Sequence, residues 1–553
     1  MKHLKRILCL SLVLVMALAL FTACGPKKKV TADGKVTVGI PGDSTIPDLD
    51  TNGYSLWLEK TTGIDVEWVK FASGAANYKQ QITLMCSGGE TLPEILVGFD
   101  GMGHYIANQL GEDGFVKDIK PLIDAGKFPT FQEQLNKLPQ KTREYVISKG
   151  TNTTEEFGGS FFSLPTVACE SIDDQQSMIY INQKWLDKVG MKAPTNIKEL
   201  GDVCKAFLEQ DPNGNGKKDE MPMLDVGNNP EVRNWIINAF VEFNGGCFNV
   251  TEDGKVWDPY VTDEFRKALK CVNDFTKKGY YNELGFTLSQ SEVKNLLSPV
   301  DGSASRVGIF GGHMETSTNS ASNILEEFVC LNPLADETGK GGYNIINDVL
   351  VSWDAYITKD CADIDEACKV LDAFYLDESV TIQRWGTEGD FWVREEVDNW
   401  FGSKSYFKVI DATAFFDKAK NATIGNTLGI MTHQNYMTQA QTKDNSTDKR
   451  QIEVTRLIQG QWEIMKGWKK TQVDTLENLV YTTEEYDYRE SVVGMFDSYR
   501  SEQTVLFMKG EKDINSDKEW NAYKEQIKKL NADKIMKTQQ DAYNRKKASQ
   551  AGE

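Results

Sequence analysis

The chain begins, after its N-terminal segment, with short apolar runs that alternate with longer amphipathic ones. The run "KVTVGI" (35–40) alternates and is rich in valine, which is typical of a strand. Two further strand candidates are "DVEWVKF" (65–71) and "PEILVGF" (93–99). Between them, "SLWLEKTTGI" (55–64) and "NYKQQITLMCSG" (77–88) have helical patterns that stop at glycines. This alternation predicts an α/β layer with a mostly parallel sheet.

The same two patterns return further along the chain. The segment "TDEFRKALKCVNDFTKKG" (262–279) has one apolar helical face, with Thr262 placed to cap its start. The runs "RVGIF" (306–310) and "VLVSW" (349–353) are strand candidates, and "CADIDEACKVLDAFYLD" (361–377) is a helix candidate. Beyond about residue 400 the pattern is mainly helical. Strands in separate parts of the chain predict lobes built from discontinuous segments.

The N-terminus has the pattern of a bacterial lipoprotein signal. A basic region is followed by an apolar run from 7 to 21, which is shorter than a membrane span requires. The run ends in "FTACG" (21–25), which resembles a lipobox whose cysteine becomes the lipidated first residue. We therefore expect a signal peptide at 1–23, lipidation of Cys24, a tether at 24–35, and anchoring on the extracellular face of the cell membrane. The alternative is an ordinary secreted protein.

Charge and composition remove several classes of function. The formal net charge of −19 disfavours nucleic acid as a partner, because nucleic-acid binding needs concentrated basic surface. The ten cysteines include no CxxC pair and the four histidines are scattered, so zinc is not expected. The roughly 520 residues that follow the signal exceed one hydrophobic core and predict at least two domains.

Five segments, in order, resemble family 1 extracellular solute-binding proteins of ABC importers, and in particular their large lipoprotein subfamily. They are "SGGETLPEILVG" (87–98), "GGSFFSLPTV" (158–167), "MIYINQKWLDKVGMKAPTNIKEL" (178–200), "WGTEGDFW" (385–392) and "FMKGEKDINSDKEWNAYKEQIKKLNADKIMKTQQDAYNR" (507–545). Ser160, Phe162 and Ile197 depart from the commoner residues of these motifs. Each motif alone is weak, whereas five in order behind a lipobox are specific.

The resemblance implies an α/β, two-lobed, periplasmic-binding-protein-like type II fold with discontinuous lobes and a helix-rich C-terminal part. We expect lobe 1 to comprise 36–164 plus 306–360, and lobe 2 to comprise 165–305 plus 361–553. The implied protein is a monomer that captures an oligosaccharide between its lobes and delivers it to ABC permease subunits. A ligand that contacts both lobes stabilises the closed state, so no chemistry on the ligand is needed.

The stretch "DPNGNGKKDE" (211–220) matches the first nine positions of an EF-hand loop, including the glycine at position 6. The bidentate glutamate of position 12 is replaced by Pro222, and "MPMLDV" (221–226) is not helical. Related solute-binding proteins carry a similar loop, which implies a structural calcium ion in lobe 2. The expected ligands are Asp211, Asn213, Asn215, Lys217 through its carbonyl, Asp219 and Glu220. The alternative is an Asn-Gly-rich turn without metal.

Candidate ligand contacts follow from the fold class. In α/β lobes a ligand meets the loops at the carboxyl ends of strands, and sugar sites combine aromatic faces with short polar side chains. The candidates are Asp43, Ser44, Phe99, Asp100, Thr166, Asp173, Asp174, Trp235, His313, Trp353, Asp354, Glu388, Asp390 and Trp392. For each tryptophan the competing interpretation is core packing. The acidic character of these turns favours a neutral or cationic solute.

Other functions remain open from the sequence. A lipid-anchored glycoside hydrolase or lyase would need two carboxyl groups at a defined separation, and Glu388 with Asp390 is the nearest pair along the chain. A calcium-dependent surface adhesin would bind a polymer or a partner protein without lobe closure. A binding protein for a peptide or another non-sugar solute would share the fold.

Overall fold

The computed structural model describes most of the chain after the expected tether. It covers residues 35–551 except for 153–157, 170–177, 228, 244, 246–247, 320–321, 344–348, 400–402, 412–413, 415–417, 426–427, 433, 436–448, 468–475, 477–478 and 480. The expected signal peptide and lipidation site at Cys24 lie outside the described residues. Within the described residues, no helix combines the length and the apolar character needed to cross a membrane.

A six-stranded mixed sheet carries the first strands of the chain. Its order is β16-β4-β11-β3-β1-β2. The strand bounds are β1 Lys35–Pro41, β2 Asp65–Phe71, β3 Ile95–Leu96, β4 Leu164–Cys169, β11 Val349–Ile357 and β16 Ile430–Met431. The pairs β1–β3 and β4–β16 are parallel, whereas β11 runs antiparallel to both β3 and β4. The expected, mostly parallel, sheet is therefore mixed, because an apolar pattern locates a strand without giving its direction.

A separate four-stranded sheet has the order β10-β5-β9-β6. Its bounds are β5 Ile179–Asn182, β6 Met221–Leu224, β9 Val307–Gly311 and β10 Phe328–Cys330. Strand β5 is antiparallel to β9 and β10, and β6 is parallel to β9. Three two-stranded ribbons complete the β-structure of the described residues: β7 Asn249–Val250 with β8 Val256–Trp257, β12 Trp392–Val393 with β15 Lys408–Val409, and β13 Val397–Asp398 with β14 Lys404–Ser405.

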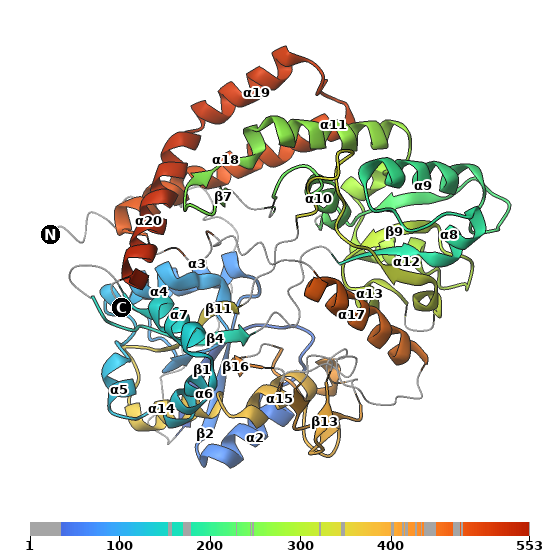
Figure 1. Cartoon of the computed structure of the whole chain (residues 1–553). Helices are drawn as coiled ribbons and strands as arrows, with labels where there is room; N and C mark the ends of the chain where they lie inside the picture. Colours follow the sequence, from blue (N-terminus) through green and yellow to red (C-terminus); the bar gives the residue numbers. More distant parts are fainter. Residues whose placement is uncertain are drawn as a thin grey trace, which may run out of the picture. The chain divides into compact units, whose positions relative to one another are not determined.

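Helices supply the rest of each hydrophobic core. Those up to β11 are α2 Gly53–Thr62, α3 Ala75–Gly88, α4 Gly103–Glu112, α5 Lys120–Asp124, α6 Pro129–Lys137, α7 Gln140–Gly150, α8 Gln183–Val189, α9 Ile197–Glu209, α10 Glu231–Ile237, α11 Asp263–Lys277, α12 Gln290–Leu297 and α13 Met314–Ser317. Those after it are α14 Ile364–Ala373, α15 Asp377–Trp385, α17 Lys449–Gly467, α18 Thr483–Lys509, α19 Asp517–Lys529 and α20 Ala532–Ala551. Helix α14 contacts α2 and α6, and α18 contacts α11, α19 and α20 (Figure 1).

Local sequence explains where several helices begin and end. The amide N–H of Phe265 donates to the Thr262 hydroxyl across 3.1 Å, which confirms the expected cap of α11. Its apolar face is buried as expected. Helix α2 ends at Gly63, whose φ of +67° is a left-handed conformation that glycine adopts at little cost.

The two sheets divide the chain differently from the expected lobe boundaries. Strand β9, expected in lobe 1, pairs with β5 and β6 in the four-stranded sheet. Helices α14 and α15, expected in lobe 2, share a hydrophobic core with β1 and α2. An apolar strand or an amphipathic helix fits either core equally well, so its pattern does not identify its partner. The part beyond about residue 400, expected to be mainly helical, contains the short strands β14, β15 and β16 before its first long helix, α17.

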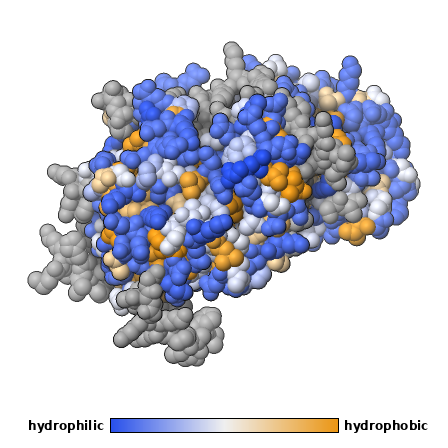
Figure 2. Space-filling view, turned by 90° about the horizontal axis from the view of Figure 1, so that it is seen from below, coloured by the Kyte–Doolittle hydropathy of each residue, from blue (hydrophilic) through white to orange (hydrophobic). Residues whose placement is uncertain are grey.

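The face of the molecule drawn in Figure 2 is mainly hydrophilic, and its hydrophobic residues form small separate groups. Large exposed apolar side chains lie far apart in the sequence, for example Leu56 in α2, Val300 in a turn after α12 and Met495 in α18. Single exposed apolar residues are normal on a protein surface and need no binding partner to explain them.

Gly150→Ala is expected to lower the free energy of unfolding by about 1–3 kcal/mol, because a methyl group would overpack the core. A Cβ at Gly150 would lie 2.0 Å from Phe161 Cε2 and 2.3 Å from Trp353 Cη2. The matched control is Gly494→Ala, in exposed α18 with no atom within 4 Å of the new Cβ. It should raise stability by about 0.5–1 kcal/mol. Urea denaturation of both variants tests the pair, and equal effects would contradict the packing argument.

Candidate functional site

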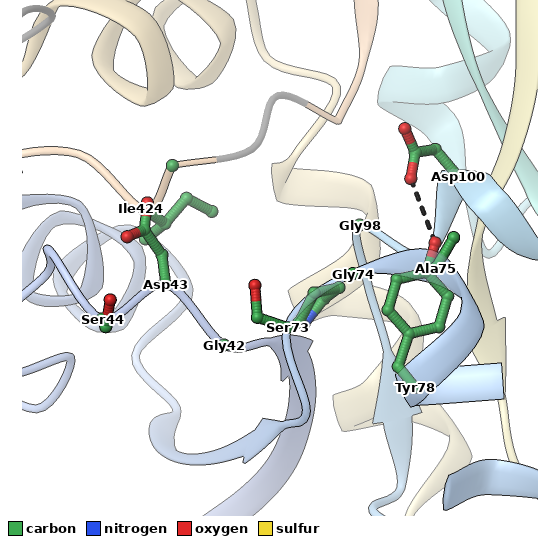
Figure 3. A pocket seen from close by; sticks show the side chains of 12 residues that line it. Gly42, Asp43, Ser44, Ser73, Gly74, Ala75, Tyr78, Gly98, Asp100 and Ile424 are labelled. Atoms are coloured by element: carbon green, nitrogen blue, oxygen red, sulfur yellow. Dashed lines mark hydrogen bonds between the residues drawn. The ribbon is translucent and has the colours of Figure 1, made fainter. Parts of the chain in front are cut away.

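A hollow of about 430 Å³ lies where the loops after β1, β2 and β3 come together (Figure 3). These loops contribute residues 41–44, 73–75 and 98–100. A fourth segment, 424–425, comes from just before β16 at the other end of the same sheet. Its lining is Pro41, Gly42, Asp43, Ser44, Ser73, Gly74, Ala75, Tyr78, Gly98, Asp100, Ile424 and Gly425. Loops at the carboxyl ends of strands are where α/β sheets bind ligands.

Asp43 is fixed by its neighbour Thr45. Its Oδ1 accepts hydrogen bonds from the Thr45 N–H across 2.8 Å and from the Thr45 hydroxyl across 2.5 Å. Partial burial acts to raise the pKa of Asp43, but the Thr45 hydrogen bonds and the charges of Lys418 and Lys70 outweigh it and hold the pKa below its usual value. Asp43 is therefore an ionised, pre-positioned hydrogen-bond acceptor at neutral pH.

Asp100 stands at the other end of the lining in the view of Figure 3, with Ser73 between it and Asp43. The Tyr78 hydroxyl donates to Asp100 Oδ1 across 3.2 Å. Tyr78 is buried on α3, with its ring edge-on to Phe99 at 5.1 Å between centroids. Because the tyrosine ring is held by core packing, its hydroxyl can orient the Asp100 carboxylate.

Asp354 lies in β11, where the register with β4 shifts between Trp353 and Ala355. It is 3% exposed, and burial raises its pKa to about 7. The hydroxyls of Thr166 and Ser352 oppose this rise, and the charge of Asp100 adds to it. Ser352 Oγ donates to Asp354 Oδ2 across 2.8 Å, whereas Oδ1 is buried without a hydrogen-bond partner. Asp354 is thus a titrating group close to the hollow.

The loop at 211–220 lies between α9 and β6, as the sequence predicts. The two oxygens of Asp211 accept from the N–H groups of Gly214 and Gly216, each across 3.1 Å. The side-chain amides of Asn213 and Asn215 both donate to Asp219 Oδ1, across 3.1 and 3.0 Å. The Oδ1 atoms of Asn213 and Asn215 accept from the N–H groups of Asn215 and Lys217, across 3.0 and 2.8 Å.

Glu220 is the last residue of this loop and is buried. Its Oε1 has no hydrogen-bond partner although the residue is only 7% exposed. Burial raises the pKa of Glu220, and the neighbouring Asp211 and Asp219 add to the rise. In the part of the chain that is described, no three His, Cys, Asp or Glu side chains are already grouped to hold a metal. The donors nevertheless fit calcium, which takes carboxylate, carboxamide and carbonyl oxygens together.

Several solved structures have a fold similar to that of this chain. The chain aligns over 93% of its length with 99% of a human-milk-oligosaccharide-binding, ABC-transporter-associated solute-binding protein of Bifidobacterium longum infantis, at a TM-score of 0.73 and 18% identity. The chain has the fold of a solute-binding protein. The S. pneumoniae substrate-binding protein FusA was solved as an EF-hand mutant in complex with fructo-nystose. Its alignment with this chain spans 93% of this chain and 100% of FusA, at a TM-score of 0.70 and 19% identity. Calcium-free AlgQ2, an alginate-binding protein, gives a TM-score of 0.65 at 19% identity, over 93% of this chain and 98% of its own.

Sequence relatives agree with the solute-binding fold. The fructooligosaccharide ABC transporter substrate-binding protein FusA of Streptococcus pneumoniae serotype 4 is 24% identical over 408 residues, 69% of this chain and 71% of FusA. Lipoprotein LipO of Bacillus subtilis is 24% identical over 49% of this chain and 50% of LipO. No protein-family model matches the chain. FusA and the Bifidobacterium protein are ABC-transporter binding proteins for oligosaccharides, and AlgQ2 binds alginate, which confirms the resemblance inferred from the five motifs.

Three of the sequence-predicted contacts, Asp43, Ser44 and Asp100, line the hollow of this solute-binding fold. Four predicted aromatic contacts are instead core residues, exposed by no more than 3%: Phe99, Trp235, Trp353 and Trp392. The indole N–H of Trp235 donates to Asn332 O, and that of Trp392 donates to Gly386 O. Core packing, the competing interpretation given for the tryptophans, accounts for the burial of all four side chains.

The remaining candidates lie elsewhere or are not described. Thr166 and Asp354 are buried in β4 and β11, and His313 is exposed just before α13. Glu388 forms an ion pair with Arg394 at 3.1 Å, and Asp390 accepts from the Thr387 hydroxyl at 2.9 Å. Asp173 and Asp174 lie outside the described residues. None of these described candidates is part of the hollow's lining, and their contact with a ligand remains a prediction.

Sequence reasoning missed Ser73, Tyr78 and the 424–425 segment. Ser73 comes two residues after the end of the β2 strand, so the rule that located Asp43 and Asp100 could have located it too. Tyr78 has the pattern of an ordinary buried helix residue, and nothing local distinguishes it. The 424–425 segment is more than 300 positions from Asp43 in sequence and could only be found from the strand order.

Proposed function

We propose that this protein is a lipid-anchored extracellular solute-binding protein that captures an oligosaccharide and delivers it to the permease of an ABC importer. The observation that carries the proposal is the polar hollow at the carboxyl ends of β1, β2 and β3, in a chain with the fold of carbohydrate-binding transport proteins. Its hydroxyl and carboxylate groups are the acceptors and donors that sugar hydroxyls require.

Binding needs no reaction of the ligand. The loops of the six-stranded sheet would hold part of the sugar, and the other lobe would contact the remainder. The free energy that drives lobe closure is then the differential affinity of the sugar for the closed state. The permease would recognise that closed state. Glu388 and Asp390, the candidate pair of a hydrolase, are each engaged locally with Arg394 and Thr387, and the relatives are binding proteins.

We further propose that the 211–220 loop holds a structural calcium ion. Asp211, Asn213, Asn215, Asp219 and Glu220 would supply side-chain oxygens, and Lys217 its carbonyl oxygen. The buried, unpartnered Glu220 Oε1 beside two other carboxylates supports this, because a cation would relieve their mutual repulsion. FusA, which has an EF-hand, is a relative of this chain. The loop lies outside the hollow, so the ion would stabilise the fold and leave the sugar untouched.

The lipid anchor is proposed at Cys24, with the protein on the outer face of the cell membrane. Its support is the lipobox-like "FTACG" and the relationship to a lipoprotein. A single acyl chain binds membranes only marginally, so a diacylated cysteine would be needed for stable anchoring. Mass spectrometry of the N-terminal peptide of the native protein tests this, and an unmodified residue 24 would contradict it.

The function is tested by a thermal-shift screen of the mature protein, with calcium present, against a panel of gluco-, fructo-, xylo-, manno- and galacto-oligosaccharides. A stabilising sugar is then titrated by calorimetry, and the mixture is checked for new reducing ends. Saturable one-to-one binding with intact sugar supports the proposal. Release of reducing ends supports a glycosidase instead, and stabilisation only by peptides would support a peptide-binding protein.

Gly425→Ala is expected to weaken sugar binding at least tenfold. Gly425 lines the hollow at a φ of +83°, and a Cβ there would lie 3.2 Å from Asp43 Oδ2 and 3.1 Å from Ile46 Cδ1. The methyl group would both strain the backbone and displace the Asp43 carboxylate. Calorimetry with the sugar found in the screen measures the effect. Gly63→Ala, which has a φ of +67° and lies outside the hollow, is the matched control and should bind normally.

A further inference from the structure

The lining of the hollow is acidic and hydroxylated. Two of its twelve residues are carboxylates, Asp43 and Asp100, and three more carry hydroxyl groups, Ser44, Ser73 and Tyr78. Among the residues described at this site, none of the lining side chains is Lys, Arg or His. A site built to take an anionic sugar would place cationic side chains, above all arginine, on its surface.

The two lysines whose charges act on Asp43 have hydrogen-bond partners of their own. Lys418 Nζ donates to Thr423 Oγ1 across 3.4 Å, and Lys70 Nζ donates to the Ile46 carbonyl across 3.4 Å. Both charges act on Asp43, which they help to keep ionised. They therefore compensate the Asp43 carboxylate and do not themselves form part of the lining.

The opposite end of the hollow has a second carboxyl group, that of Asp354, buried behind the exposed Asp100. Asp100 is oriented into its position by the Tyr78 hydroxyl, and buried Asp354 lies close enough for the two carboxyl groups to influence each other. No lysine or arginine contributes to that interaction among the described groups that act on Asp354. A carboxylate brought here by a ligand would meet the like charge of Asp100.

A neutral sugar meets the same groups favourably. Its hydroxyls can donate to the carboxylate oxygens of Asp43 and Asp100, and hydrogen bonds to a charged acceptor are shorter and stronger than neutral ones. We propose that the hollow accepts a neutral glycosyl unit and rejects uronic, sulfated or phosphorylated sugars, with Asp43 and Asp100 as the selecting residues. The inference rests on the proposed function, which it narrows to a class of substrate.

The distinction matters because proteins of this fold bind both classes of sugar. FusA is a fructooligosaccharide-binding protein, whereas AlgQ2 is an alginate-binding protein, and alginate is a polymer of uronates. Fold alone therefore does not say which class this chain takes. The lining residues do, because the free energy of selection comes from the charge that the ligand meets in the site.

The test compares three forms of one sugar by calorimetry in the presence of calcium. They are the neutral oligosaccharide that binds best in the screen, the same sugar with its primary hydroxyls oxidised to carboxylates, and the methyl ester of that acid. The ester has the size of the acid without its charge. The wild-type protein should bind the acid at least a hundredfold more weakly than the ester, and higher salt should narrow the difference.

Two isosteric variants assign the effect to residues. Asp43→Asn and Asp100→Asn keep the oxygens that accept from Thr45 and Tyr78. Each substitution should lower the ratio of the dissociation constant of the acid to that of the ester at least tenfold. Asp50→Asn, at an exposed position outside the lining, is the matched control and should leave the difference unchanged. If the wild-type protein binds the acid as tightly as the ester, or if neither Asn variant alters the ratio, the selection proposal is wrong and sugar capture stands. If no form of any oligosaccharide binds, both proposals fall.

Discussion

Removal of calcium is expected to lower the melting temperature of the mature protein by roughly 5 °C, the consequence of losing about 3 kcal/mol of stability. A site filled at a hundred times its dissociation constant stabilises the folded state by about 2.7 kcal/mol, which corresponds to several degrees for a large domain. Without the ion, the carboxylates of Asp211, Asp219 and Glu220 remain close together, one of them buried with an unpartnered oxygen. Differential scanning calorimetry with excess calcium and with EGTA measures the difference.

A variant at the first loop position separates calcium from other effects of chelation. Asp211 adopts a φ of +45°, a conformation that asparagine tolerates well, so Asp211→Asn should fold and yet respond at least threefold less to calcium. Asp202→Asn, on the exposed face of α9, is the control and should respond like the wild type. An EGTA-insensitive wild-type melting temperature would rule out the structural ion.

The unfolding free energy is expected to fall as the pH rises from about 4 to about 7, with Asp354 contributing up to about 4 kcal/mol of that loss. Burial raises the pKa of Asp354 from an ordinary value of 3.8 to about 7, so the folded protein holds this proton more tightly than the unfolded chain does. The stabilisation is complete below the unfolded value and disappears as the pH passes the folded value. Urea denaturation at a series of pH values, with calcium saturating, measures the slope.

Asp354→Asn removes the titrating group while keeping its shape. In the variant, the unfolding free energy should lose most of the pH dependence that Asp354 contributes. The variant should also be more stable than the wild type at pH 7.5, where the wild type carries a buried charge. Asp258, whose pKa burial raises to about 6 despite the opposing charge of Arg500, titrates in the same direction and remains in the variant. Some slope should therefore persist. Identical slopes in the two proteins would show that Asp354 is ionised throughout.

Elements with strong local patterns were predictable from the sequence, whereas their partners were not. Helix α11, with its Thr262 cap and one apolar face, and strands β1 and β2 lie where the sequence places them. Strand β9 is equally clear as a strand, but its neighbours are β5 and β6 because backbone hydrogen bonding is common to all strands and carries no sequence label. Local pattern therefore fixes an element's type more firmly than its sheet.

The candidate site shows the same limit. The rule that ligands meet the carboxyl ends of strands located Asp43, Ser44 and Asp100, because it uses only local boundaries. The aromatic candidates failed because a tryptophan gains more from complete burial than from exposure in an open site, and Trp353 and Trp392 fill their cores. The acidic loop was located from its spacing and from the resemblance to related solute-binding proteins, because its candidate ligands are close in sequence.

The 424–425 segment has a consequence for the order of events during synthesis. The loops after β1, β2 and β3 are made early, but the hollow gains its last wall only when the chain reaches residue 425, and the sheet its last strand at β16. At about 5–20 residues per second, the wait between β4 and β16 is on the order of tens of seconds. A chain truncated before residue 424 would hold most of the sheet and none of this wall. The hollow that we propose for sugar capture is thus incomplete until roughly three quarters of the polypeptide has been made.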